Sequence, residues 1–165
     1  MDVTNPAANS SPSSSSVHSE SSKSSASQPS FLGGTSSATH LVVLVHGLWG
    51  QPQHMHSIAR SLRAQYPADD LYLHCAADNS GMRTYDGVEH GGERVCAEIE
   101  ALLAHKAKND ACGFRKISMI GYSLGGLLAR YAIGLLEAKG VLNMLECMVS
   151  LWTQTFNPRN TINPC

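Results

Sequence analysis

The stretch Gly121-Tyr122-Ser123-Leu124-Gly125-Gly126 decides the fold. It follows the apolar run Ile117-Ser118-Met119-Ile120, which is typical of a strand, and it opens a helix-like segment. The pattern G-x-S-x-G between a strand and a helix holds a serine hydroxyl at the tip of a strained turn, the nucleophile elbow. Glycine removes the Cβ atoms that would collide in so tight a turn. The pattern therefore predicts a serine hydrolase with Ser123 as its nucleophile and with three elbow glycines, Gly121, Gly125 and Gly126.

A second motif lies upstream, and it matters because G-x-S-x-G alone also fits an ordinary glycine-rich turn. Residues 41–45 form a run of aliphatic side chains, the signature of a strand buried on both faces, and the run leads directly into His46-Gly47-Leu48-Trp49-Gly50. In elbow-type hydrolases, a backbone N–H in the loop after such a strand stabilises the oxyanion. The two motifs together predict an oxyanion hole formed by the N–H groups of Leu48 and Leu124.

Four blocks of the sequence resemble the serine esterase family designated DUF676. They are residues 45–50, residues 79–87, Gly91-Gly92-Glu93-Arg94 and residues 120–127, all within about residues 40–146. Several separate matches in one order make the resemblance specific. It implies a lipase, phospholipase or esterase that acts on lipid acyl esters, with Ser123 as the nucleophile. Some members of the family lie on lipid droplets, so the resemblance is also compatible with peripheral contact with droplets or membranes.

A serine nucleophile needs a base, and elbow-type hydrolases supply it in the order Ser, then Asp or Glu, then His. All eight histidines of this chain precede Ser123, and the sequence after Glu146 departs from the family pattern. His46 is the nearest substitute by topology, although hydrogen bonding to its own loop is the favoured interpretation. His90 and Asp86 are weaker candidates in the loop after the second predicted strand.

Two hypotheses remain open. In the first, the chain is an amino-terminal portion of a lipase- or esterase-type protein; the complete form is catalytic and this chain is inactive. In the second, the chain is a non-catalytic hydrolase-like module that binds a lipid or a partner protein. A nucleotide-binding protein is a weaker alternative because no G-x-G-x-x-G or P-loop is present. We also expect low solubility, since the sheet edge after residue 151 and one side of the elbow helix would be uncovered.

The order of elements predicts an α/β-hydrolase-like three-layer sandwich around a mostly parallel, incomplete sheet. Strands are expected at residues 41–45, 71–75, 116–120 and 145–151, and helices at 54–65, 93–108 and 124–139. Residues 76–92 are expected to form a loop. The domain is expected to span 40–151, between a disordered serine-rich tail at 1–39 and an irregular tail at 152–165.

Composition narrows the partners and the compartment. The net charge of −1 and the absence of a basic block argue against nucleic acid, and no apolar run reaches the ~20 residues of a membrane span. Five scattered cysteines without a C-x-x-C pair indicate reduced thiols in the cytoplasm. His54-Met55-His56 gives two histidines on different helix faces, and no further ligand cluster accompanies them, so no metal site is expected. No cofactor is expected either. The sequence leaves the oligomeric state open.

Overall fold

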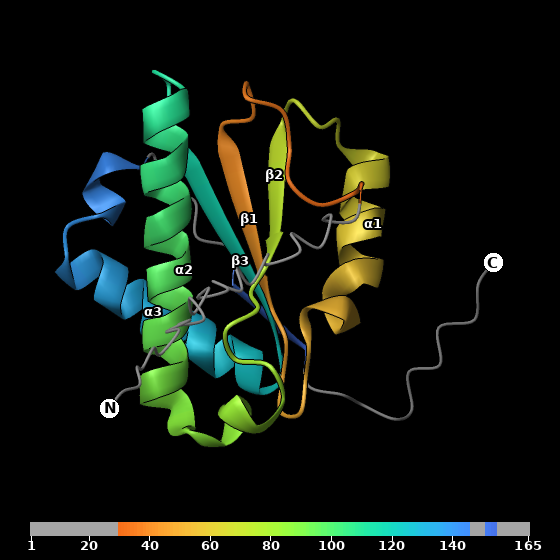
Figure 1. Cartoon of the computed structure of the whole chain (residues 1–165), viewed down its shortest axis with the longest axis vertical. Coiled ribbons are helices and arrows are strands. Elements are labelled where there is room, and N and C mark those ends of the chain that lie inside the picture. The colour runs from red at the N-terminus through yellow and green to blue at the C-terminus, as the bar shows by residue number, and fades with distance from the viewer. Residues whose placement is uncertain (1–29, 146–150, 155–165) are drawn as a thin grey trace, which may run out of the picture.

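A four-stranded parallel sheet lies at the centre of the molecule (Figure 1), in the order β2-β1-β3-β4. The computed structural model describes residues 30–145 and 151–154. The sheet packs between α1 on one face and α2 and α3 on the other, so the predicted three-layer α/β architecture is confirmed. The strands are β1 (His40–Val45), β2 (Leu71–Cys75), β3 (Lys116–Tyr122) and β4 (Leu151–Gln154).

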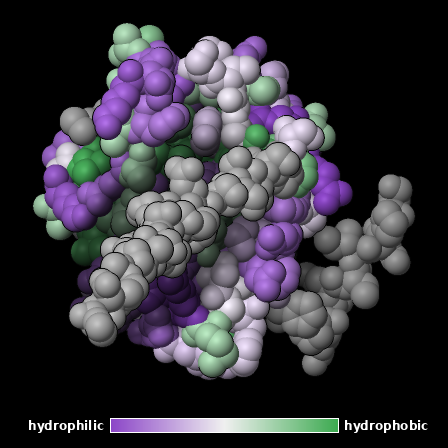
Figure 2. All heavy atoms as spheres, in the orientation of Figure 1, coloured by the Kyte–Doolittle hydropathy of each residue, from purple (hydrophilic) through white to green (hydrophobic). Residues whose placement is uncertain are grey.

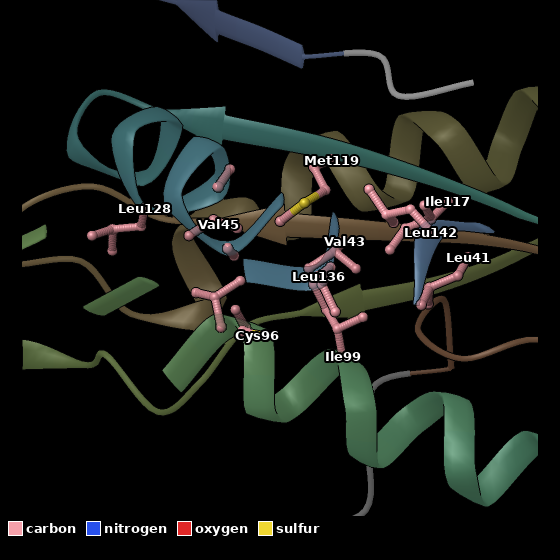
Figure 3. Packing of buried hydrophobic residues seen from close by; sticks show 14 of the residues in the cluster. Leu41, Val43, Val45, Cys96, Ile99, Ile117, Met119, Leu128, Leu136 and Leu142 are labelled. Atoms are coloured by element: carbon pink, nitrogen blue, oxygen red, sulfur yellow. The ribbon is translucent and has the colours of Figure 1, made fainter. Parts of the chain in front are cut away.

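Strand β1 is buried on both faces, which explains its unbroken aliphatic sequence. Alternate side chains divide between two apolar clusters, because successive residues of a strand point to opposite faces. Leu41, Val43 and Val45 pack toward α2 and α3, whereas Val42 and Leu44 pack toward α1. Figure 3 shows the first of these clusters, in which β1 and β3 meet residues from both helices and from η3 (Leu142–Met144).

The helices agree with the sequence prediction except at one start. The pair η1 (Pro52–Met55) and α1 (His56–Gln65) lies within about two residues of the predicted helix, and α3 (Leu124–Ala138) begins at the predicted residue. Gly140 follows α3 with φ +71°, in keeping with its predicted role at the end of that helix. Helix α2 (Gly87–Asn109), in contrast, starts well before the predicted residue 93, and η2 (Gly81–Tyr85) precedes it.

The early start of α2 has a packing cause. Gly91 and Gly92 suggested a loop, because glycine is a poor helix former. In the fold they allow α2 to approach α3 closely. A Cβ at position 91 would lie 2.7 Å from Leu128 Cδ2, and one at position 92 would lie 2.5 Å from Tyr131 Cδ1. The prediction of a loop over 76–92 is therefore wrong for its last six residues, since contact between helices overrides the local preference.

The predicted ends of the domain also need correction. The last strand among the described residues is β4, so the predicted strand over 145–151 is confirmed at Leu151 and wrong at Leu145, and the predicted irregular tail is wrong for residues 152–154. Pairing with β3 sets this position, with Met119 opposite Leu151 and Tyr122 opposite Gln154. The apolar sequence after residue 140 contained no signal for that register. Residues 146–150 and 155–165 lie outside the described residues.

The prediction of a disordered tail to residue 39 is wrong for residues 30–39. Gly33 and Leu73 exchange two backbone hydrogen bonds, of 2.8 and 2.9 Å, and this places a short antiparallel bridge on the edge of β2. Phe31 and Leu32 pack against the cluster on the α1 side. Residues 1–29 lie outside the described residues, so the prediction for them is untested.

Figure 2 shows a face on which hydrophilic and hydrophobic residues are mixed, with a small hydrophobic group at its lower edge, where η2 lies. Among the described helices, none is both long enough and apolar enough to cross a membrane.

Candidate active site

Ser123 lies between the last residue of β3 and the first residue of α3, and the residue is exposed. Its backbone has φ 53° and ψ −122°, a conformation that side chains other than glycine seldom adopt. Strain of this kind persists only where the surrounding structure enforces it. The serine therefore has the backbone of the predicted elbow.

The elbow glycines allow three backbone segments to meet. A Cβ at Gly121 would lie 2.5 Å from both N and Cα of Gly126, at the start of α3. A Cβ at Gly125 would lie 2.2 Å from Val45 O and 2.5 Å from His46 O. These contacts are with backbone, so no side-chain adjustment could relieve them. Glycine is needed here because α3 begins directly against the ends of β3 and β1.

The loop after β1 packs on the elbow. Strands β1 and β3 pair in parallel with Val45 opposite Gly121, so both motifs emerge side by side at the carboxyl edge of the sheet. A Cβ at Gly47 would lie 2.9 Å from Tyr122 O and 3.1 Å from Ser123 Cβ. The pairing of β1 with β3 thus brings the two sequence motifs into direct contact.

The two N–H groups predicted to form the oxyanion hole are free of competing backbone acceptors. Within residues 30–145 and 151–154, no hydrogen bond takes up the N–H of Leu48. Leu124 is the first residue of α3, and the first N–H groups of a helix have no acceptor within it. Convergence of these N–H groups on one point beside Ser123 stays a prediction.

The segment that includes η2 braces the loop after β1, a contact that the motif analysis missed. Trp49 has φ 57°, and its N–H donates to Thr84 Oγ1 over 3.2 Å. Its ring meets that of Tyr85 edge to face, with centroids 5.2 Å apart, and the N–H of Gly81 donates to Gly50 O over 3.0 Å. The resemblance block at residues 79–87 was the only signal for this segment.

His46 is buried, with 1% of its surface exposed. Its Nδ1 lies 3.1 Å from Gly47 O, and the carbonyl can only accept, so Nδ1 carries the proton. Its Nε2 is buried without a hydrogen-bond partner in the described part of the chain. These contacts match the interpretation that His46 bonds its own loop.

Asp86 and His90, the weaker candidates for a catalytic role, do not contact Ser123 through a hydrogen bond. Asp86 pairs with Arg94, whose guanidinium also donates to Asn79 Oδ1 over 3.3 Å, while His90 is exposed on α2. Across the described ranges, no hydrogen bond joins the Ser123 hydroxyl to any histidine. The structure thus places the Gly47 loop against Ser123, and Leu124 directly follows Ser123, but neither Asp86 nor His90 is bonded to Ser123.

Among the described residues, Glu98 is the carboxylate with the most hydrogen-bond partners. It accepts hydrogen bonds from the N–H groups of Ala77 and Asp78, and it lies 2.8 Å from His74 Nε2. Burial acts to raise the pKa of Glu98, but the bonds from His74 and the two N–H groups outweigh it, so the net pKa lies below the usual value. Glu98 therefore anchors the chain where it leaves β2.

Two of the hollows in the described part of the chain bear on the position of the site. A hollow of about 430 Å³ adjoins the loop after β1, and its lining combines polar and apolar groups: His46, Gly47, Leu48, Gly50, His54, Met55, Ser57, Ile58 and Tyr122. A larger one, of about 690 Å³, is lined by residues of β1, β3 and the α1–β2 region and touches neither motif. The hollow of about 430 Å³ lies nearer the candidate site, because it reaches Tyr122, the residue before Ser123.

The histidines of the rejected metal motif point to different partners. Gln51 N donates to His54 Nδ1 over 3.3 Å, whereas the ring of His56 packs edge-on against Phe31. In the described part of the chain, no group of three or more His, Cys, Asp or Glu side chains is arranged to hold a metal ion.

The parallel three-layer fold and the elbow define a chain of the α/β-hydrolase type. The chain belongs to the family described as "Putative serine esterase (DUF676)", whose profile matches residues 35–157. It is 35% identical over 94 residues to triacylglycerol lipases from Pseudarthrobacter phenanthrenivorans and Burkholderia plantarii. The aligned region is 54% of this chain but only 27% and 24% of those lipases, so the chain spans about a quarter of their length. The family and these relatives support a hydrolase.

Solved structures with some likeness to this chain include two hydrolases. The RedJ thioesterase of the prodiginine pathway in Streptomyces coelicolor is 20% identical, with a TM-score of 0.47 over 70% of this chain and 42% of its own. Esterase PE8 is 15% identical, with a TM-score of 0.44 over 75% of this chain and 87% of its own.

Proposed function

We propose that Ser123 is the nucleophile of a carboxylic ester hydrolase that acts on lipid acyl esters in its complete form. The observation that carries the proposal is the contact between Gly47 and a strained, exposed Ser123. A serine with a strained backbone could by itself belong to an ordinary tight turn. A strained serine packed against a loop with a free N–H is suited to acyl transfer.

The chemistry assigns a role to each group. The Ser123 Oγ attacks the ester carbonyl, and its proton passes to a base. The N–H groups of Leu48 and Leu124, together with the positive end of the α3 dipole, stabilise the oxyanion. The bond to the alcohol then breaks as the alcohol takes up that proton. Water attacks the acyl-serine and releases the carboxylic acid, with Ser123 regaining its proton.

The base must come from elsewhere, because no histidine within the described residues bonds to Ser123. The lipase relatives extend well beyond the aligned region, and sequence of that kind would supply the acid and the histidine. Without them, the remaining groups in well-studied triads retain only ~10³–10⁴-fold catalysis over water. We therefore expect the present chain to turn over ester substrates very slowly.

An apolar rim at the carboxyl edge of the sheet supports a lipid substrate. Large exposed hydrophobic side chains lie at or after the carboxyl ends of three strands and in the first turn of α3: Leu48, Trp49, Met82, Tyr85, Tyr122 and Leu127. Six exposed hydrophobic side chains at one edge of the sheet favour a substrate with a long apolar acyl chain over a small polar ester. The same rim would support peripheral binding to a membrane or lipid droplet from the cytoplasm.

The rim also favours one alternative, a non-catalytic module that binds lipid or a partner protein. A fluorophosphonate probe separates the two functions, because Ser123 Oγ must displace fluoride from phosphorus. Slow labelling of the chain that is lost in Ser123→Ala supports the esterase, whereas rapid labelling that depends on Ser123 would show that the chain itself contains a base, with His46 as the first candidate. The matched control is Ser118→Ala, since Ser118 Oγ lies 2.9 Å from His40 Nε2 and Ser118 is the other candidate nucleophile of β3. Labelling that depends on Ser118 or on neither serine contradicts the proposal.

The substrate class needs a separate assay on a form that carries the acid and the histidine. Short-chain esters, triacylglycerols and phospholipids should all be compared with an amide of the same acyl group. Hydrolysis of the long-chain lipid esters supports the proposed class. Amide hydrolysis without ester hydrolysis would show that the class is wrong.

A further inference from the structure

The peptide group between Gly47 and Leu48 carries two functions at its two ends. Its N–H is the Leu48 donor of the proposed oxyanion hole. Its carbonyl, Gly47 O, accepts from His46 Nδ1 over 3.1 Å and from the N–H of Gly50 over 2.9 Å. Since none of the described peptide bonds is cis, this N–H points away from its own carbonyl. Whatever fixes the carbonyl therefore fixes the direction of the N–H.

We propose that His46 is a positioning residue that aims the Leu48 N–H at the oxyanion, a role that rests on the proposed esterase function. His46 is suited to it because the residue is buried and cannot swing away. A hydrogen bond to the carbonyl also polarises the same peptide group and makes its N–H a stronger donor. His46 does not itself touch the reacting atoms.

Gly50 leaves the space that this bond needs. A Cβ at position 50 would lie 2.5 Å from His46 Nδ1 and 2.6 Å from Gly47 O, which are the two atoms of the bond. Alanine there would push a methyl group between them. Within residues 46–50, His46 thus supplies the donor, Gly47 and Leu48 form the peptide group that accepts, and Gly50 leaves space for the bond between them.

The unpartnered Nε2 of His46 argues against a simpler structural role. A histidine kept only to fill space would leave a buried nitrogen without a partner, which is unfavourable relative to an apolar side chain of similar shape. Leucine would avoid that cost. The bond from Nδ1 to Gly47 O is the only hydrogen bond of the His46 side chain among the described residues, so it is the feature that explains histidine here.

The test compares His46→Asn with His46→Leu in the full chain. Asparagine places an amide N–H where Nδ1 was, whereas leucine has no donor, and both lack the imidazole ring. We expect the Leu48 amide resonance in ¹⁵N-labelled protein to stay near its wild-type position in His46→Asn and to move in His46→Leu. We also expect fluorophosphonate labelling of Ser123 to slow about 10- to 100-fold in His46→Leu and to recover largely in His46→Asn.

A second variant covers the case in which leucine at position 46 prevents folding. Gly50→Ala keeps the histidine but separates the bonded atoms, so it should move the Leu48 resonance and slow labelling as His46→Leu does. Gly134→Ala is the matched control, because a Cβ at position 134 in α3 meets nothing within 4 Å. Leu48 resonances that coincide in His46→Asn and His46→Leu, or a Gly50→Ala protein that labels as fast as wild type, would overturn the proposal.

The two proposals can fail separately. If no variant is labelled, wild type included, the esterase function lacks support in this chain, and the Leu48 resonance alone decides whether His46 orients the peptide group. If labelling depends on Ser123 but does not differ between asparagine and leucine at position 46, the esterase function stands and the role of His46 is wrong.

Discussion

The two ends of β3 each present a serine, and the comparison shows what a serine needs in order to react. Near the amino end, Ser118 is half-buried in a regular strand and is bonded to His40. Just past the carboxyl end, Ser123 is exposed on a strained backbone beside free N–H groups but has no bonded histidine in the described residues. Ser118 has a bonded histidine, whereas Ser123 has the proposed donors in the adjoining loop and helix but no bonded histidine among the described residues.

The difference follows from the fold. Parallel strands direct their carboxyl ends, and the N-termini of the helices that follow them, to one edge of the sheet. Positive partial charge therefore gathers around Ser123 and not around Ser118. A histidine next to a serine is easily provided by side chains, but an arrangement of backbone donors requires this edge.

The largest expected effect is on stability, and it tests how closely α3 packs against the carboxyl end of β1. Gly125→Ala would place a Cβ 2.2 Å from Val45 O, and backbone cannot yield as a side chain can. Overpacking of this kind costs about 1–3 kcal/mol and occasionally more, so we expect a large drop in the urea midpoint or failure to fold. Gly134→Ala in the same helix should be neutral or stabilising. Equal stabilities of the two variants would contradict the proposed packing of α3 against β1.

The next effect tests whether Glu98 supports the carboxyl edge. Glu98→Gln weakens the bonds to Ala77, Asp78 and His74, and we expect a loss of about 1–3 kcal/mol in urea unfolding at neutral pH. Glu100→Gln, on the same helix, removes only a surface pair with Lys139 and should cost less than about 1 kcal/mol. A larger loss in Glu100→Gln would show that Glu98 is not the anchor.

A smaller effect is expected at the amino end. Ser118→Ala removes the bond to His40, which should lower the free energy of unfolding by about 0.5–1.5 kcal/mol. The rate of Ser123 labelling should not change, because Ser118 lies outside the proposed machinery. A slower rate in Ser118→Ala, with the fold intact by circular dichroism, would show that the two ends of β3 are coupled.

The smallest effect is a difference in pH dependence between the two ends. Burial, and then the nearby Lys116, lower the pKa of His40. The unfolded chain therefore takes up this proton first, and the stability contributed by neutral His40 should be lost as pH falls through and below about 6.5. The pKa of Glu98 is lowered too, so its contribution is present above about pH 4.3 and should be lost below that value.

Urea melts from pH 8 to pH 3 would separate these windows. His40→Gln should flatten the upper part of the profile, and Glu98→Gln should flatten the lower part. A profile that His40→Gln leaves unchanged between pH 7 and pH 5 would contradict the assignment of the upper window.

Much of the site was predictable because it depends on local sterics. The elbow needs glycines around a serine between a strand and a helix, and a strand buried on both faces needs an unbroken aliphatic run, so both could be read directly from Ser123 and from residues 41–45. The brace from Thr84 and Tyr85 onto Trp49 was not predictable in this way. It joins the loop after β1 to η2, and the approach of these two segments depends on the pairing of β1 with β2.

The sequence by itself determined the α/β class, the order of the elements, the elbow and the loop that meets it. Periodicity, glycine placement and aliphatic runs act over a few residues and are visible in the chain. Only the tertiary structure decided where α2 begins, which residues form β4, that residues 30–39 join the edge of β2, and that His46 bonds the peptide group of Leu48. Each of these depends on contact or register between segments whose approach the linear pattern does not encode, and such contacts override local preferences because they bury surface and satisfy backbone groups together.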